Sequence, residues 1–222
     1  MENRIEARAN RILEQLRQDE RLGRYVDRTL LVPRPYRGSG TIRLIVLGQD
    51  PTVKNPEARK AIRTVLNLDR NQSVRAYLAG VCNALGVQIT ENVYATNFYK
   101  NFFICPPTQI TEIDVFQEFR DAWLALLKDE LEAFAGIPVI SLGEPLLAPL
   151  VSKNASTKVR DYWGYTPEWK EGKVKSFEYI RAADNRLNRI IFPFPHQPSL
   201  RKQFYKATMS DYVSFVKSVA FS

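Results

Sequence analysis

Three polar side chains that could take part in bond cleavage each follow a short apolar stretch of this sequence. Asp50 lies in Gly48-Gln49-Asp50-Pro51, Asn97 follows the second stretch, and His196, the sole histidine, follows the last. A carboxylate can orient or deprotonate water, an amide offers both a donor and an acceptor, and a neutral imidazole can donate to a developing anion. These groups act together only if the elements that carry them converge.

The apolar stretches are typical of buried β-strands, because they are short, continuous and rich in β-branched residues. Strands are predicted at 42–47, 92–96, 137–142 and 189–194. Helices are predicted between and around them, at 5–17, 56–66, 73–85, 112–134, 145–151 and 203–219. This alternation predicts an α/β fold, a three-layer α/β/α sandwich with a central four-stranded parallel sheet.

The 222 residues fit one domain, 1–222, with the N-terminal helix at about 1–20 packed on it. No repeat or linker divides the chain. The region 152–188 is polar and irregular, and its aromatic residues are expected to hold this long loop to the body rather than to stack on nucleic-acid bases. These residues are Tyr162, Trp163, Tyr165, Trp169 and Tyr179.

The predicted sheet would bring the polar residues together. In open parallel sheets, ligands bind beside the carboxyl ends of the strands. Asp50, Asn97, Gly143-Glu144 and His196 all follow strand ends, so one rim would hold a carboxylate, an amide and an imidazole. Glu144 is expected to accept hydrogen bonds from amides at a helix N-terminus.

Composition narrows the classes of partner. The chain has 32 Lys plus Arg against 24 Asp plus Glu, a net charge of +8, which favours polyanions such as nucleic acid. Basic residues also follow each polar landmark: Lys54, Arg59, Lys60 and Arg63, then Lys100, then Arg201, Lys202 and Lys206.

Other features argue against several classes of protein. No apolar run approaches the roughly 18 residues of a membrane span, and the first residues do not resemble a secretory signal. Cys82 and Cys105 are too few for a disulfide framework, and with one histidine they match no compact zinc motif. We therefore expect a cytoplasmic protein with no metal, no cofactor and no membrane partner.

Gly48-Gln49-Asp50-Pro51 resembles the water-activating motif of uracil-DNA glycosylases, G-Q-D-P-Y-H. His196-Gln197-Pro198-Ser199-Leu200 resembles the second motif of that family, H-P-S-P-L, and Asn97 stands where the family places its base-reading asparagine. The order and approximate spacing of the three agree, and the resemblance spans roughly positions 40–210. It implies the fold of that family and a role in DNA base-excision repair.

The resemblance also implies roles for individual residues. Asp50 and His196 would be catalytic, activating water and stabilising the uracil anion. The base would be bound by Gln49, Asn97, Phe98 and Thr52, with Phe102 as a second candidate for stacking. DNA, single- or double-stranded, would be contacted by Ser199, Leu200, Arg201 and Lys202, with Leu200 as a wedge in the base stack. The family implies a monomer that needs no cofactor.

The sequence departs from the family pattern at both motifs. Thr52-Val53 replaces the Tyr-His pair, and in the family that tyrosine excludes the methyl group of thymine. Gln197 replaces the first proline of the second motif, and Pro198-Ser199 stand in the opposite order. These departures indicate a divergent member.

Two other interpretations stay open. The chain could be a catalytically weak or inactive member that binds a nucleic acid or a nucleotide. It could also be an unrelated α/β enzyme, such as an esterase or a nucleotide-binding protein. The lack of G-x-S-x-G, G-x-x-x-x-G-K-[ST] and G-x-G-x-x-G strings argues against the latter.

Overall fold

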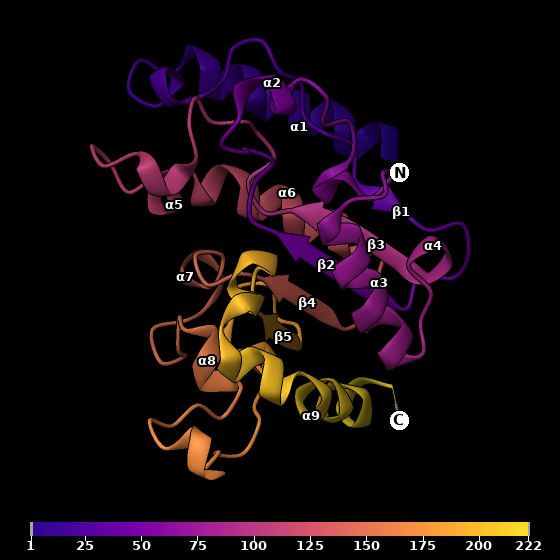
Figure 1. Ribbon diagram of the computed structural model, residues 1–222. Coiled ribbons are helices and arrows are strands. Elements are labelled where there is room, and N and C mark those ends of the chain that lie inside the picture. Colours follow the sequence, from indigo (N-terminus) through magenta and orange to yellow (C-terminus); the bar gives the residue numbers. More distant parts are fainter. Residues whose placement is uncertain (1, 222) are drawn as a thin grey trace.

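A five-stranded, mostly parallel sheet forms the centre of the computed structural model, which describes residues 2–221 apart from the side chains of Glu2, Asn3 and Pro198 (Figure 1). The strands are β1 (Tyr36–Arg37), β2 (Leu44–Gly48), β3 (Val93–Asn97), β4 (Val139–Leu142) and β5 (Ile191–Phe194). Their order is β1-β3-β2-β4-β5, and only β1 runs antiparallel to its neighbour. The four predicted parallel strands are confirmed. The fifth, β1, has only two residues and leaves no recognisable pattern in the sequence.

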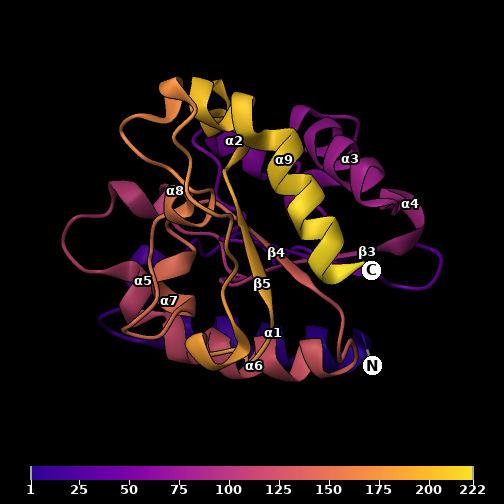
Figure 2. The same ribbon diagram turned by 90° about the horizontal axis from the view of Figure 1, so that it is seen from below.

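Helices cover both faces of the sheet, an arrangement compatible with three α/β/α layers. On one face α1 (Glu2–Gln18) packs against α6 (Arg120–Glu132), and on the other α3 (Ser73–Leu85) packs against α9 (Gln203–Ala220) (Figure 2). The shorter helices are α2 (Pro56–Arg59), α4 (Ile89–Asn92), α5 (Val115–Glu118), α7 (Leu147–Leu150) and α8 (Val159–Tyr162). Within residues 2–221, none of the helices combines the length and the apolar character that crossing a membrane requires.

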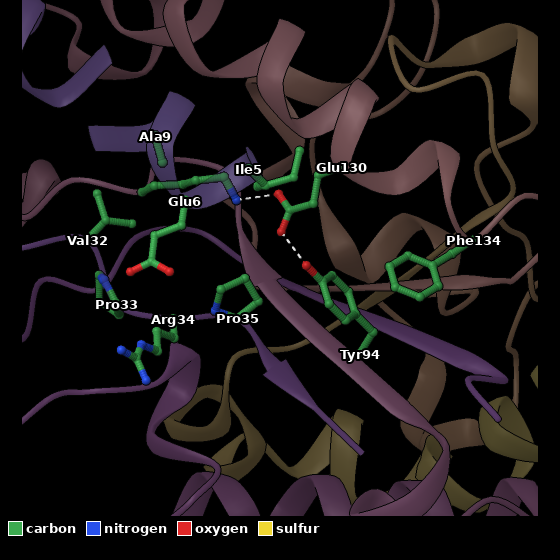
Figure 3. Close-up of a pocket in the computed structure, with 11 residues that line it drawn as sticks. Ile5, Glu6, Ala9, Val32, Pro33, Arg34, Pro35, Tyr94, Glu130 and Phe134 are labelled. Atoms are coloured by element: carbon green, nitrogen blue, oxygen red, sulfur yellow. Dashed lines mark hydrogen bonds and ion pairs between the residues drawn. The ribbon is translucent and has the colours of Figure 1, made fainter. Parts of the chain in front are cut away.

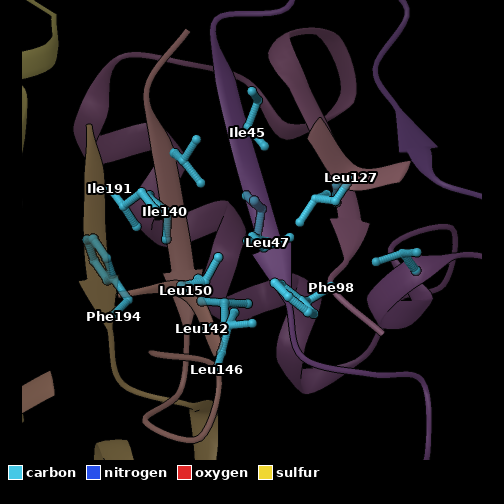
Figure 4. Packing of buried hydrophobic residues seen from close by; sticks show 14 of the residues in the cluster. Ile45, Leu47, Phe98, Leu127, Ile140, Leu142, Leu146, Leu150, Ile191 and Phe194 are labelled. Atoms are coloured by element: carbon cyan, nitrogen blue, oxygen red, sulfur yellow. The ribbon is translucent and has the colours of Figure 1, made fainter. Parts of the chain in front are cut away.

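The hydrophobic core lies on both sides of the strands because every residue of β2, β3, β4 and β5 is buried. A strand that is apolar along its whole length fits only a sheet covered on both faces, as the continuous apolar stretches predicted. Figure 4 shows Leu47, Ile140 and Ile191 on three adjacent strands, with Leu127 of α6 and Leu150 of α7 packed against the sheet.

Aromatic residues hold the long segment 152–188 to the body, as predicted. The Trp163 ring stacks on Tyr212 of α9 at 4.2 Å between centroids, and its indole N–H donates to the carbonyl of Pro193 at 2.7 Å. Tyr165 and Trp169 pack edge-on against Phe204, also in α9. These rings are therefore structural.

The helix predicted at 56–66 is wrong beyond Arg59. The amide of Arg34 donates to the carbonyl of Arg63 and the amide of Val65 donates to the carbonyl of Arg34, both at 2.9 Å, so this backbone is extended. Leu66 and Asn67 follow with φ of 58° and 51°, in the left-handed region. A pairing partner thirty residues away, invisible in local spacing, overrides the helical pattern.

The single helix predicted at 112–134 is two helices. It is interrupted at Phe119, which closes α5 with φ −90° and ψ −7° and precedes α6. The Phe119 ring packs edge-on against Phe103, with 5.1 Å between centroids. The buried Phe119 ring thus lies at the break between the two helices, and the spacing of apolar residues alone does not indicate this break.

Candidate active site

The carboxyl ends of the parallel strands place the predicted residues along one edge of the sheet. In the register, Gly48 pairs with Asn97, Leu47 with Ser141, and Leu142 with Phe194. Because neighbouring strands lie about 4.8 Å apart, Asp50 and His196 leave strands about 10 Å apart, with the end of β4 between them. The predicted rim is thus present.

Gly48 makes room for the Asn97 side chain. A Cβ atom on Gly48 would lie 2.3 Å from Asn97 Oδ1, a separation that no side chain could tolerate. Asn97 is 1% exposed, and its Oδ1 has no hydrogen-bond partner among the described residues. A buried acceptor without a partner costs about 1–3 kcal/mol, so this oxygen is suited to a donor supplied by a ligand.

Leu66 also lies close to Gly48. Its Cδ2 atom lies 3.1 Å from the position that a Cβ on Gly48 would take. Leu66 has a left-handed backbone, which is unfavourable for a leucine and is found mainly where the surroundings enforce it. Since Asn97 is 1% exposed, a ligand can reach it only when the side chains that cover it move aside.

The Asp50 carboxylate is held by its own turn. Its Oδ1 accepts from the Thr52 amide at 2.7 Å, and its Oδ2 accepts from the Gln49 side-chain amide at 2.9 Å. Desolvation raises the pKa of Asp50 to about 6, against hydrogen bonds from Thr52 and Gln49 and the charge of Arg59, which lower it. The residue as a whole keeps partial contact with solvent. Asp50 is therefore mostly ionised at neutral pH yet more basic than an ordinary aspartate.

Two turns are joined into one unit at this edge. The amides of Phe98 and Tyr99 donate to the carbonyls of Gly48 and Gln49 at 2.9 Å, and the amide of Phe103 donates to Thr52 Oγ1 at 2.8 Å. The Asp50 turn therefore cannot shift without the chain that follows Asn97.

Arg59 stabilises this unit from inside the protein, which corrects its grouping with the basic residues expected to favour a polyanion. It is 4% exposed, and its guanidinium donates to the carbonyls of Val53, Phe103 and Ile104 at 2.6, 3.2 and 2.7 Å. Backbone carbonyls that would otherwise be unsatisfied occupy its donors.

His196 lies at the other side of the rim. Gly143, with φ +93°, places a would-be Cβ 3.4 Å from the Cβ of His196, so the two chain segments are in contact. The imidazole is exposed and makes no hydrogen bond with a described residue, while partial desolvation lowers its pKa from 6.5. His196 is therefore neutral at physiological pH and has both ring nitrogens available.

The aromatic residues predicted to stack on a base are in the core, which corrects that expectation for the present conformation. Phe98 is 0% exposed, with its ring 4.7 Å from that of Tyr99, and Phe102 is 2% exposed. Neither ring offers an open face. Gln49 and Thr52, also predicted to bind the base, instead hold Asp50.

The segment after His196 keeps its basic residues free. Arg201 and Lys202 are exposed and form no ion pair with a described residue, while Ser199 donates its amide to the carbonyl of His196 at 2.7 Å. Leu200 is only partly buried and packs against the core, so part of it remains accessible.

Lys100, predicted with the basic residues, is buried, and this too is a correction. Its ammonium forms an ion pair with Glu130 of α6, and the two side chains are 5% and 1% exposed. The sequence shows Lys100 close to Asn97 but contains no sign of Glu130 as its partner. Glu144 behaves as expected, since its carboxylate accepts from the Val159 amide at the beginning of α8 at 3.2 Å.

A metal centre is not evident in the part of the chain that the structure describes, where no three histidine, cysteine, aspartate or glutamate side chains gather as a metal site requires. Cys82 and Cys105 are free, and burial raises the pKa of the Cys82 thiol to about 12, which makes it unreactive. The polar rim is therefore the candidate active site.

Comparison with known proteins adds no assignment, since no protein-family model and no curated sequence matches this chain.

Proposed function

We propose that this chain is a divergent uracil-DNA glycosylase, which hydrolyses the N-glycosidic bond of uracil in DNA during base-excision repair. The observation that carries the proposal is the buried Asn97 amide with its unpaired Oδ1, seated against Gly48 beside the Asp50 turn. The motif resemblance and the basic residues after His196 support it. The free cysteines are compatible with a reducing cytoplasm, and we expect a monomer.

Asp50 would act on water. The C1′–N1 bond breaks with its electron pair going to N1, which leaves an oxocarbenium-like sugar and a uracil anion. Water adds to C1′ and gives its proton to the Asp50 carboxylate, whose negative charge also stabilises the cationic sugar. A pKa of about 6 makes this carboxylate a stronger base than usual while leaving it ionised at neutral pH.

His196 would act on the leaving group. A neutral imidazole donates one N–H to O2 of uracil as negative charge develops there. Desolvation keeps the pKa of His196 below its usual value, so the neutral form predominates at physiological pH. No other described side chain competes for its hydrogen bonds.

Asn97 would select the base. Its Oδ1 accepts from N3–H of uracil and its Nδ2 donates to O4, whereas cytosine presents an acceptor at position 3 and a donor at position 4. Cytosine would leave both amide atoms unpaired in a buried site, which is a strong basis for rejection. Thr52 is smaller than the tyrosine of the family and is tied to Phe103, so exclusion of thymine would be weaker.

A gel assay on labelled oligonucleotides with U:G, U:A, single-stranded U, T:G or hypoxanthine tests the proposal. We expect alkali-sensitive sites at uracil with the wild-type protein and their loss in Asp50→Asn and His196→Ala. Cutting at T:G would add that Thr52 leaves room for a methyl group. Folded protein that binds DNA but creates no such site on any substrate would refute the glycosylase.

A base-binding module without efficient excision is the second candidate. Thr52 and Gln197, which depart from the family motifs, favour it, whereas the cover over the buried Asn97 would have to open for either function. The two candidates differ in excision by the wild-type protein, which an enzyme shows and loses in Asp50→Asn; a binding module excises nothing, and Asp50→Asn leaves its DNA binding unchanged.

A further inference from the structure

A buried ionic network lies behind the rim, on the face of the sheet covered by α1 and α6. Lys100 Nζ donates to Glu130 Oε2 at 2.5 Å, to Thr96 Oγ1 at 2.7 Å and to the carbonyl of Asn97 at 3.3 Å. The Tyr94 hydroxyl donates to the other carboxylate oxygen, Glu130 Oε1, at 2.6 Å. All three ammonium protons and both carboxylate oxygens therefore have partners.

The network borders a cavity of about 270 Å³ beneath α1. Figure 3 shows the Glu130 carboxylate beside the Tyr94 hydroxyl, and the cavity is also lined by Lys100, by the apolar residues Ile5, Ala9 and Phe134, and by the charged residues Glu6 and Arg34. The two side chains are nonetheless 5% and 1% exposed, so the two charges lose most of their hydration and must compensate each other. Apolar residues of similar size would often be as stable there, so stability alone does not account for the ion pair.

Asn97 needs support that its own side chain does not receive. Its Oδ1 is unpaired, and no hydrogen bond from the amide to a described residue fixes its orientation. The position of the amide therefore depends on the backbone at the end of β3. Lys100 turns back along the chain and binds that backbone at the Asn97 carbonyl, while Thr96 and Glu130 fix the ammonium itself.

We propose that Lys100, held by Glu130, is a positioning residue that sets the orientation of the Asn97 amide for base recognition. This inference rests on the proposed function for its catalytic consequence, but its structural part concerns Asn97 alone. Lys100 is buried against Glu130 and would touch neither the base nor the sugar. It acts by fixing the turn at 97–100, to which the Asp50 turn is also joined through the amides of Phe98 and Tyr99.

The test uses the full chain and a paired substitution, because Lys100→Met alone would leave the Glu130 carboxylate buried without its cation and could unfold the protein. In Lys100→Met/Glu130→Gln, residue 130 can still accept from Tyr94, while the donor to the Asn97 carbonyl is lost. Lys100→Arg keeps a cation and serves as the conservative variant. The exposed pair in Lys173→Met/Glu171→Gln is the matched control for loss of a lysine and a glutamate.

Two readouts separate the outcomes. The first is the Asn97 side-chain amide signal in ¹H–¹⁵N spectra, assigned by its disappearance in Asn97→Ala. The second is the single-turnover rate of uracil excision beside the dissociation constant for DNA. In the paired variant we expect a folded protein, a shifted or broadened Asn97 signal, DNA binding within about two-fold, and excision slower by about 10- to 100-fold, as a small displacement of a reacting group can produce. Lys100→Arg should recover part of the rate, and the control pair should match the wild type.

A folded paired variant with an unchanged Asn97 signal would overturn the inference whatever its excision rate. A displaced signal with wild-type excision would overturn the functional part. If the wild-type protein excises nothing while the Asn97 signal responds as expected, the proposed glycosylase fails and the positioning of Asn97 by Lys100 stands.

Discussion

Asp50→Asn should make this protein more stable at neutral pH, although it removes the proposed base. Burial raises the pKa of Asp50 from 3.8 to about 6, so the folded chain holds this proton more tightly than the unfolded chain does. The stabilising contribution of the protonated carboxyl is complete below pH 3.8 and is lost as the pH rises through about 6. Asparagine is never ionised and does not incur that loss.

The difference in pKa corresponds to at most about 3 kcal/mol, and the partial exposure of Asp50 reduces it to about 1–2 kcal/mol through solvent screening. The Asp50→Asn substitution leaves the contacts of Asn97 unchanged. Asparagine can still accept from the Thr52 amide through its oxygen, and Gln49 can turn its own amide to accept from the new NH₂ group. These two changes in hydrogen bonding should not cancel the gain in the free energy of unfolding.

Urea unfolding followed by tryptophan fluorescence would measure it at pH 7.5 and at pH 3.5. We expect a higher free energy of unfolding for Asp50→Asn at pH 7.5 and no difference at pH 3.5. Asp211→Asn, at an exposed position of α9, controls for the gain of one positive charge. Equal stability of Asp50→Asn and wild type at pH 7.5, or the same gap at both pH values, would refute the reasoning.

Three further outcomes follow from the same geometry. Gly48→Ala would press its Cβ against Asn97 Oδ1, so we expect the free energy of unfolding to fall by about 1–3 kcal/mol. Single-turnover excision should be at least about 100-fold slower, and an unaltered excision rate would contradict the role of this clearance. Arg59→Met leaves three backbone carbonyls without their donor and should lower the free energy of unfolding in urea by about 2–4 kcal/mol. The control Arg63→Met, at an exposed position, should lower it by less than about 1 kcal/mol. Equal effects of the two substitutions would count against the structural role of Arg59. Excision should fall about tenfold per pH unit below pH 6, where Asp50 becomes protonated, and stay level above it; a flat profile down to pH 5 would argue against Asp50 as the base.

Elements whose signals are local were predictable from the sequence. The four apolar stretches became β2, β3, β4 and β5, and the helical spacing at 73–85 and 203–219 became α3 and α9 with boundaries that agree to within one residue. In each of these elements, the apolar residues that define the sequence pattern are the residues that pack in the core. The pattern therefore predicts which residues are buried.

Features that depend on distant partners were not predictable. Residues 63–65 are extended because Arg34 pairs with them, although their own spacing is helical. Arg59 and Lys100 are basic residues near motifs, and only the fold shows that backbone carbonyls and Glu130 hold them inside. Burial of Phe98 likewise follows from how the chain bends at the end of β3.

The candidate site was predictable in its position more than in its detail. The carboxyl ends of parallel strands had to bring Asp50, Asn97 and His196 to one edge, whatever the side chains do there. The clearance that Gly48 gives Asn97 and the approach of Leu66 to Gly48 depend on contacts between strands and loops. No sequence pattern encodes them.

The most direct test of the account measures binding and excision on the same samples. Wild type and Asp50→Asn would be titrated with a fluorescent uracil-containing single strand by anisotropy, and free uracil released in a single turnover would be quantified by mass spectrometry at pH 7.5. We predict similar dissociation constants, with release of one uracil per abasic site by wild type and loss of release in the variant. Binding by both proteins with no uracil released by wild type would contradict it.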